Sequence, residues 1–545
     1  MLQLTGTITA LSYETLTVND GQNYNDKQLL KVGSSSDGVK TDIGTVSSTG
    51  RYMWIRFQTS SSNNDYDGLD LIVTLIAPNT ESDISITPTN NGSVVAKVGG
   101  SEVTKANVGD VVTLSATPAE NYVLAGITVA DANSNPVSVA GGAWYDNTAT
   151  FTMPATAVTV VPEFEAVSLL DPYINMPKNG TLTATIPAAV STFKVYDDGG
   201  ENSAYSSNSN GMIVLKAPVG CMLHLKGSVK GNNDAKLTVW DGTDTTDDEA
   251  KLIDGACSPA NGEKLVGGIV TSGQYMTLQF NVTGYNLGSF EGLNLDVTRV
   301  DVCLDNIGNN SESISQNAGR QGLNVALKNR TLYKDGKWNT LCLPFNVTLS
   351  GSPLEGATAR SLTTAKIEGS TLDLTFGDAV TELVAGTPYI IKWANGSDIV
   401  SPVLFEGVTV STDKHDYDTD GDNTTTDERV RFVGTYESSV FSAEDNSILL
   451  VGGSNTLFYP NERTGLGAQR AYFKIGADGA LQARRLTSFN FNEGQNGTTG
   501  ILTVGTKMEK AGEPDTWYTL DGMKLQGKPT KKGLYTINGK KFVIK

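Results

Sequence analysis

The sequence has few of the residues on which most enzymes depend. Only two histidines, His224 and His415, occur among 545 residues. Most serine, cysteine and metal-dependent hydrolases need at least one placed histidine. His224 lies inside an alternating strand pattern and His415 in an Asp-rich loop, so we expect a half-buried strand residue and a solvated loop residue. We therefore predict that the chain is not an enzyme.

Cysteine is also scarce, with four in the whole chain. Such a number is too low for a disulfide scaffold, and no pair has the close spacing of a zinc site. Pairing of Cys221 with Cys257 stays open, but we expect the cysteines to be mainly small buried apolar residues. The four are Cys221, Cys257, Cys303 and Cys342.

No run of 18 apolar residues occurs, so we expect no transmembrane helix. The net charge of -18 disfavours a nucleic-acid partner, because phosphate binding needs concentrated Lys and Arg. Short alternating runs of Val, Thr, Ile and Tyr lie between turn residues, and glycine is frequent. This pattern predicts an all-β protein of roughly three to five domains, built as tandem antiparallel β-sandwich modules.

The chain contains two copies of one domain. MLQLTGTITALSYETLTVNDG at residues 1–21 matches MLHLKGSVKGNNDAKLTVWDG at residues 222–242 without a gap. The match continues where SSTGRYMWIRF answers VTSGQYMTLQF and where DGLDLIVTLI answers EGLNLDVTRV. The second copy also has a section from Leu170 onward for which the first has no counterpart. We expect Met1 to lie in mid-domain, with further chain and a signal peptide upstream.

YDDGG, LTVWDG and SGQYMTLQF in the second copy resemble the CUB family of antiparallel β-sandwiches. The resemblance covers residues 170–302 and, in truncated form, residues 1–80. It implies an antiparallel β-sandwich fold.

Strand alternation predicts which side chains of the two copies face outward. It places Trp54 and Trp240 on outer faces, whereas Met53, Ile55 and Phe57 face inward. An exposed indole is a platform on which a sugar ring or a partner side chain could stack. The alternative is that each tryptophan packs across strands or against a neighbouring domain.

Three further segments can be distinguished by their sequence patterns. Residues 82–166 carry VGDVVTLSATPAENYVLAGITV and FTMPATAVTVVPEF, which resemble the divergent internalin B-repeat, a small β-grasp-like spacer of bacterial surface proteins. Residues 303–321 are polar and predict a linker. Residues 322–501, with RTLYKDGKWNTLCLPF, resemble a β-sandwich-like domain of Bacteroidetes surface proteins whose activity is unknown. Its core should include Leu341, Leu343 and Phe345.

DYDTDGDNTTTD has the spacing of a calcium loop, with acidic residues at positions one, three, five and twelve and glycine at six. Such carboxylates repel one another unless a cation gathers them. The alternative is a solvated hairpin tip, because no helix flanks the segment and the twelfth residue is not Glu. The predicted calcium ligands are Asp416, Asp418, Asp420 and Asp427.

The last segment, residues 515–545, reverses the charge of the chain, with seven Lys against two Asp. YTLDGMKL and GLYTINGKKFVIK predict hairpins with turns at 521–522 and 538–539. YTLDG, PTKKGLY and NGKKFVIK resemble the C-terminal sorting domain of the type-nine secretion system of Bacteroidetes. That resemblance implies export through outer-membrane secretion machinery to the surface of a Gram-negative bacterium.

We therefore expect a secreted or surface adhesin that binds a glycan or an extracellular protein. Two alternatives stay open. The modules could be accessories of a secreted hydrolase whose catalytic domain lies upstream, because paired carboxylates need only Asp and Glu. They could also be a structural spacer without a ligand, since fold does not determine function.

Overall fold

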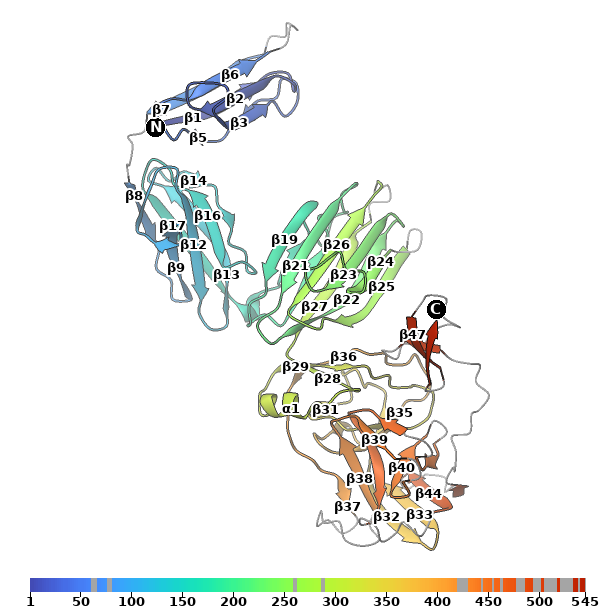
Figure 1. Ribbon diagram of the computed structural model, residues 1–545. Coiled ribbons are helices and arrows are strands. Elements are labelled where there is room, and N and C mark those ends of the chain that lie inside the picture. The colour runs from blue at the N-terminus through green and yellow to red at the C-terminus, as the bar shows by residue number, and fades with distance from the viewer. Residues whose placement is uncertain are drawn as a thin grey trace. The chain divides into compact units, whose positions relative to one another are not determined.

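The structure is a computed structural model, and it confirms the prediction of an all-β protein (Figure 1). The only helices among the described residues are one turn of 3-10 helix at Val167–Leu169 and α1, Ser311–Asn317. The chain divides into two units, residues 1–171 with 185–189 and residues 172–184 with 190–545. The structure describes residues 1–59, 66–75, 81–257, 262–285, 290–418, 430–442, 445–452, 455–460, 464–476 and 486–493, and the strand backbones at 501–503, 517–519, 533–537 and 540–544.

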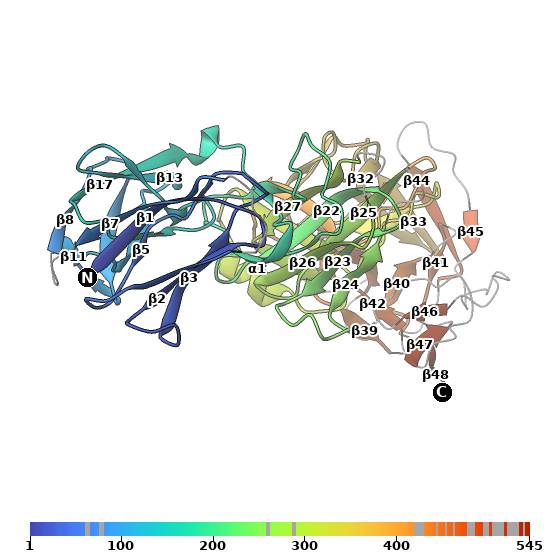
Figure 2. The same cartoon turned by 90° about the horizontal axis from the view of Figure 1, so that it is seen from above.

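The first module is a small sandwich of two sheets (blue in Figures 1 and 2). In one sheet β1 pairs with β7 on one side and with the short β4 and β5 on the other, and in the other sheet β2 lies between β3 and β6. Leu4, Ile8, Leu16 and Val18 alternate along β1 and β2 and form its core. The strands are β1 (Leu2–Thr9), β2 (Thr15–Asp20), β3 (Lys27–Gly33), β4 (Thr41–Asp42), β5 (Val46–Ser47), β6 (Trp54–Gln58) and β7 (Gly68–Leu75).

The second sandwich has two five-stranded sheets, ordered β18-β20-β27-β22-β25 and β19-β21-β26-β23-β24 (green in Figure 1). Its core is formed by alternate residues such as Leu223, Leu225, Leu278 and Val297, all fully buried. The strands are β18 (Tyr173–Asn175), β19 (Asn179–Thr185), β20 (Thr192–Tyr196), β21 (Asn210–Lys216), β22 (Met222–Gly231), β23 (Ala235–Asp241), β24 (Lys251–Ala256), β25 (Gly262–Val270), β26 (Tyr275–Val282) and β27 (Gly292–Val300).

The repeat seen in the sequence is a repeat of structure. β1, β2, β3, β6 and β7 occupy the places of β22, β23, β24, β26 and β27, and the same strand pairings recur. The second sandwich has two strands more in each sheet, β18 and β20 beyond β27, and β19 and β21 beyond β26. In the first sandwich, β6 and β7 are therefore edge strands among the described residues.

A glycine occupies the same position in both copies, Gly6 in β1 and Gly227 in β22. Gly6 and Gly227 have φ of +140° and +149°, and a Cβ there would lie 2.0 Å from the carbonyl oxygen of Asp70 and 2.2 Å from that of Asn294. The neighbouring strand runs too close for any side chain. Glycine is therefore required at this point of both β1 and β22.

Between the copies lies a module of two five-stranded sheets, ordered β10-β9-β12-β16-β15 and β11-β8-β17-β13-β14. β8 pairs with β17 in parallel, and Val112, Leu114 and Val160 are fully buried in its core. Its strands are β8 (Glu81–Ile86), β9 (Gly92–Val98), β10 (Ser101–Glu102), β11 (Lys105–Asn107), β12 (Val111–Pro118), β13 (Tyr122–Asp131), β14 (Pro136–Val137), β15 (Ala140–Gly141), β16 (Thr148–Thr152) and β17 (Val158–Ala166).

The C-terminal β-domain, residues 302–503, has two buried apolar clusters. Leu341, Leu343 and Phe345 are buried in the first, as predicted. Its strands are β28 (Val302–Asp305), β29 (Leu323–Lys328), β30 (Asn339–Leu341), β31 (Val347–Thr348), β32 (Thr358–Glu368), β33 (Thr371–Phe376), β34 (Glu382–Leu383), β35 (Tyr389–Lys392), β36 (Val403–Val408), β37 (Tyr417–Asp418), β38 (Val430–Thr435), β39 (Ser439–Phe441), β40 (Ile448–Val451), β41 (Leu457–Phe458), β42 (Thr464–Leu466), β43 (Arg470–Ile475), β44 (Ser488–Glu493) and β45 (Ile501–Thr503).

The predicted linker at residues 303–321 is wrong. β28 pairs in parallel with β29, and Leu304 is fully buried. Ile314, on α1, is also buried, and Asn310 bonds to the carbonyl oxygens of Asp305 and Tyr436. Few apolar residues are needed to fix so short a segment, because its polar side chains bond to backbone groups of the domain.

The tail forms a three-stranded sheet of β46 (Trp517–Thr519), β47 (Gly533–Ile537) and β48 (Lys540–Ile544), ordered β46-β47-β48. Ile537 pairs with Lys540, as expected for a hairpin with a two-residue turn at 538–539. The turn residues themselves, and the other predicted turn at 521–522, lie outside the described residues.

Candidate functional site

An aromatic pair on the first sandwich forms the candidate binding site. Trp54 begins β6 and is half-buried, and its ring lies 6.3 Å from that of Tyr24 at an interplanar angle of 52°. Tyr24 is 67% exposed, on the turn between β2 and β3. Arg56, two residues after Trp54 on β6, is exposed. Two aromatic rings with a cationic residue on the same strand suit a ring-shaped or planar ligand.

Asn19 positions this pair. It lies on β2 directly opposite Trp54, and its side-chain amide donates to the carbonyl oxygens of Tyr24, at 2.9 Å, and Asp26, at 2.7 Å. Asp26 in turn accepts the amide of Asn23. Because Asn19 is buried, its two bonds hold the turn that carries Tyr24. Asn19 is therefore a positioning residue, and sequence reasoning missed both its role and Tyr24.

The signal that could have found them was the difference between the copies. Asn19 stands where the second copy has Trp240, and Trp54 stands where it has Thr277. These positions are a cross-strand pair in both sandwiches, Asn19 with Trp54 and Trp240 with Thr277. Each copy thus has one tryptophan at the same place, contributed by opposite strands.

The predicted exposure of Trp240 is wrong. Its side chain is only 5% exposed, and it lies opposite Thr277, which is fully buried. The pairing of β23 with β24 is irregular between Leu237 and Val239 and again between Val239 and Trp240, so simple alternation does not hold there. A buried indole offers no stacking face, and Trp240 is no longer a ligand-binding candidate.

Ile55 faces inward as predicted, because it pairs across the strands with the buried Val18, but its side chain is not fully covered. Met53 and Phe57 pack partly against the core of the first sandwich, but Ile55 is 37% exposed. Its counterpart Leu278 is fully buried. The difference follows from the strand pairing, because β6 has a neighbour on one side only among the described residues.

The acidic loop is only partly described. Asp416 and Asp418 lie on either side of Tyr417, and both face Arg431 of β38, with N to O distances of 3.8 Å and 3.6 Å. One oxygen of Asp416 accepts the amide of Gly434 at 2.8 Å, and burial raises the pKa of Asp416. Asp420 and Asp427 lie outside the described residues.

A calcium ion would share Asp416 and Asp418 with a guanidinium. Both carboxylate oxygens of Asp418 are buried without a hydrogen-bond partner, which suits a cation, but Arg431 already supplies a positive charge beside them. The described residues contain no group of three His, Cys, Asp or Glu side chains that could hold a metal. Calcium at this loop stays a prediction.

His415 lies in an exposed loop as expected, whereas His224 on β22, expected to be half-buried, is only 3% exposed. Burial lowers the pKa of His224 to about 4, so the imidazole is neutral at physiological pH.

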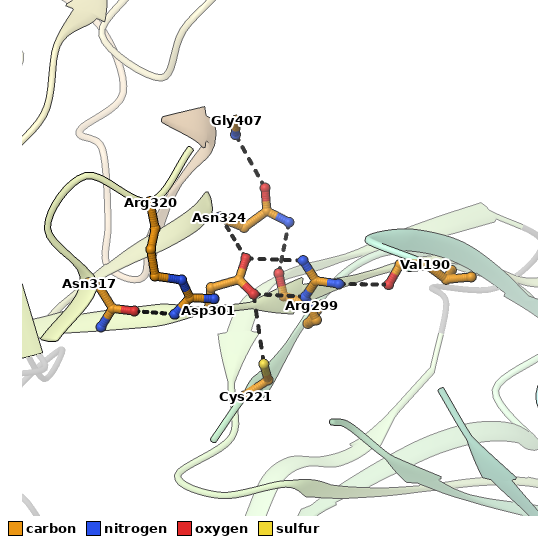
Figure 3. Close-up of polar contacts among 8 residues, drawn as sticks. All are labelled: Val190, Cys221, Arg299, Asp301, Asn317, Arg320, Asn324 and Gly407. Carbon is orange, nitrogen blue, oxygen red and sulfur yellow. Dashed lines mark hydrogen bonds and ion pairs between the residues drawn. The ribbon is translucent and has the colours of Figure 1, made fainter. Parts of the chain in front are cut away.

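All four cysteines are free thiols, so Cys221 and Cys257 do not pair. Cys342 is buried, and burial raises its pKa to about 12, whereas Cys221 is only half-buried. Figure 3 shows the thiol of Cys221 beside Asp301, with Sγ 3.7 Å from a carboxylate oxygen. Asp301 also accepts from Arg299 at 2.8 Å and from the amide of Asn324 at 2.9 Å (Figure 3). This cluster joins the end of β27 to the start of β29, and its charges are paired.

The comparisons with known proteins identify one module of the chain. Residues 82–168 match the model of the divergent InlB B-repeat domain. That match confirms the resemblance predicted for residues 82–166, and it concerns this module alone. No curated protein matches the chain. No helix of the described residues is long and apolar enough to span a membrane.

Among solved structures, the CUB1-EGF-CUB2 domains of rat MASP-1 are 12% identical, with 55% of this chain and 86% of that chain covered and a TM-score of 0.17. The CUB1-EGF-CUB2 domain of human MASP-1/3 is also 12% identical, with 55% of this chain and 88% of that chain covered and a TM-score of 0.17. The extracellular region of zebrafish Gpr126/Adgrg6 is 15% identical, over 57% of this chain and 35% of that chain, with a TM-score of 0.17. Such TM-scores carry no argument about this chain.

Proposed function

We propose that this protein is a non-enzymatic binding protein, displayed on a bacterial surface or secreted, that recognises a glycan or an extracellular protein through its first sandwich. The aromatic pair of Tyr24 and Trp54 is the observation that carries the proposal. The ligand would stack on the indole and the phenol ring, while Arg56 offers hydrogen bonds to a hydroxyl or carboxylate.

The module organisation supports this proposal. A matched InlB B-repeat stands between two copies of one sandwich, so that repeated β-units follow one another along the chain. The proposed route to the surface is the basic tail, which resembles a type-nine sorting domain and forms its own small sheet. The outer-membrane secretion machinery of a Gram-negative bacterium would then be its partner.

A binding experiment on the full chain tests the aromatic pair. Trp54→Ala should weaken binding on a glycan array or to an extracellular-matrix panel by roughly tenfold or more, because a stacking partner is lost. Tyr13→Ala removes another exposed ring of the same module and should leave binding unchanged. Asn19→Ala should weaken binding while Trp54 remains in place, since the turn that holds Tyr24 loses two hydrogen bonds.

Either of two results would contradict recognition through the aromatic pair. If the wild-type chain binds nothing on either panel, or if Trp54→Ala and Tyr13→Ala lose binding equally, the aromatic pair is not the recognition site. Turnover of a substrate by the purified chain would contradict the non-enzymatic assignment.

A further inference from the structure

The edge strands of the first sandwich expose apolar residues that are buried in the second. Ile55 on β6 is 37% exposed and its counterpart Leu278 is fully buried, and Val73 on β7 is 51% exposed while its counterpart Val297 is fully buried. Both positions are apolar in both copies. Among the described residues of the first sandwich, no strand covers these two side chains as β20 and β21 cover their counterparts.

The second sandwich shows what covers them. β21 pairs antiparallel with β26 from Asn210 to Lys216, and β20 pairs antiparallel with β27 from Thr192 to Tyr196. Both strands carry alternate apolar residues that are at most 2% exposed, namely Phe193, Val195, Ile213 and Leu215. In the part of the first sandwich that the structure describes, β6 pairs only with β2 and β7 only with β1.

We propose that the β6 and β7 edges form an acceptor site for two extended strands, one added to each sheet, with the alternating apolar chemistry of NGMIVLK and TFKVY. The added backbones would pair with the N–H and C=O groups on the outer side of β6 and β7, which no described strand pairs, and their apolar side chains would cover Ile55 and Val73. Strand addition of this kind takes affinity from main-chain hydrogen bonds and specificity from alternate side chains.

The chemistry of the edges favours such an occupant over a polar one. Natural edge strands are commonly protected by charged side chains, above all lysine, by proline or by a bulge. WIRFQ on β6 and GLDLIVTL on β7 have one charged residue each, Arg56 and Asp70, and neither lysine nor proline. The register of β7 against β1 is unbroken from Leu2 to Thr9. A glycan would leave these backbone groups and apolar side chains unmatched.

The test adds a second copy of residues 170–221 of this chain directly before Met1, in the order in which those residues precede Met222. In the extended full chain, hydrogen–deuterium exchange of β6 and β7 amides should slow by at least tenfold relative to the unmodified chain. The matched control carries Val195→Asp and Ile213→Asp in the added copy only, and should leave the exchange of β6 and β7 fast.

Unchanged exchange at β6 and β7 in the extended chain would overturn the proposal. It would also be overturned if the unmodified chain showed protection of these strands that grows with protein concentration, because the edges would then pair with their own kind. The readout is exchange, so it is independent of whether Trp54 binds a ligand.

Discussion

At the scale of single residues, burial and pairing decide what a polar group can do. The spacing of Asp416 and Asp418 predicts that both side chains point to one side of the segment, and both do face Arg431. The sequence could not predict Arg431 itself, because the pairing of β37 with β38 places it next to Asp418. Sequence alternation likewise singled out Trp54 as a candidate but not Tyr24, which lies beside it on a turn held by Asn19, because a turn has no periodicity. Long-range contacts were the missing information in both cases.

The charge balance at this loop gives a prediction. Arg431→Gln leaves the buried carboxylate of Asp418 without its cation, and breaking a buried ion pair costs about 3 to 5 kcal/mol of unfolding free energy. We expect a lower thermal midpoint, partly recovered by millimolar calcium. Lys366→Gln, which breaks the exposed pair with Glu368, should change nothing measurable. If calorimetry finds no heat of calcium binding for either the wild type or Arg431→Gln, the calcium prediction is wrong.

At the scale of strands, the sequence predicted the sandwich repeat well because its two copies could be compared residue by residue. The failures lie where pairing departs from the ideal. The pairing at Val239 and Trp240 is irregular, so alternation does not predict the burial of Trp240. Ile55 faces the core but is 37% exposed, because β6 is an edge strand among the described residues. The prediction of a linker failed because β28 and α1 are fixed by only a few buried residues, among them Ile314.

One sheet of the second sandwich contains two titratable groups with opposing effects on stability. Asp197 follows β20 and is fully buried, and burial raises its pKa to about 6, although it accepts the amides of Leu293 and Gly199. The folded state then holds more protons than the unfolded state between about pH 4 and 6, so this group lowers stability as pH rises. His224, with its pKa lowered to about 4, does the reverse, and stability rises with pH between about 4 and 6.5.

We therefore expect a shallow pH dependence for the wild-type sandwich and opposite slopes in two variants. Asp197→Asn should become more stable as pH rises from 4 to 6.5, and His224→Gln should become less stable from 4 to 6. The measurement is the urea concentration at which the second sandwich, residues 172–300, is half unfolded at each pH. Pulse proteolysis reports the folded fraction. Slopes of the same sign in the two variants would contradict the opposing protonation of Asp197 and His224.

At the scale of the whole molecule, the order of the modules was readable because each has its own sequence pattern. Residues 82–168 match a known repeat family, and the two sandwiches are recognisable as copies because their sequences are similar. The function was harder to predict, because one copy has a half-buried tryptophan beside an exposed tyrosine and the other copy has a buried tryptophan. A difference of two residues at one cross-strand pair, Asn19 with Trp54 against Trp240 with Thr277, separates the two outcomes.

The tail offers the prediction that concerns the molecule as a whole. Its strands β46, β47 and β48 pair with one another and, among the described strands, with none of the preceding modules, so we expect those modules to keep their strand pairing when residues 515–545 are removed. The truncated chain should keep the thermal transitions of the full chain and its binding through Trp54. Both chains are expressed behind the same added N-terminal signal peptide in a bacterium with a type-nine secretion system. The truncated chain should then remain inside the cell, whereas the full chain should reach the surface or the medium. A control chain with Lys540 and Lys541 replaced by Gln keeps the length of the tail and tests whether its positive charge matters. Surface display of the truncated chain, measured by protease accessibility of intact cells, would show that the tail is not the export signal.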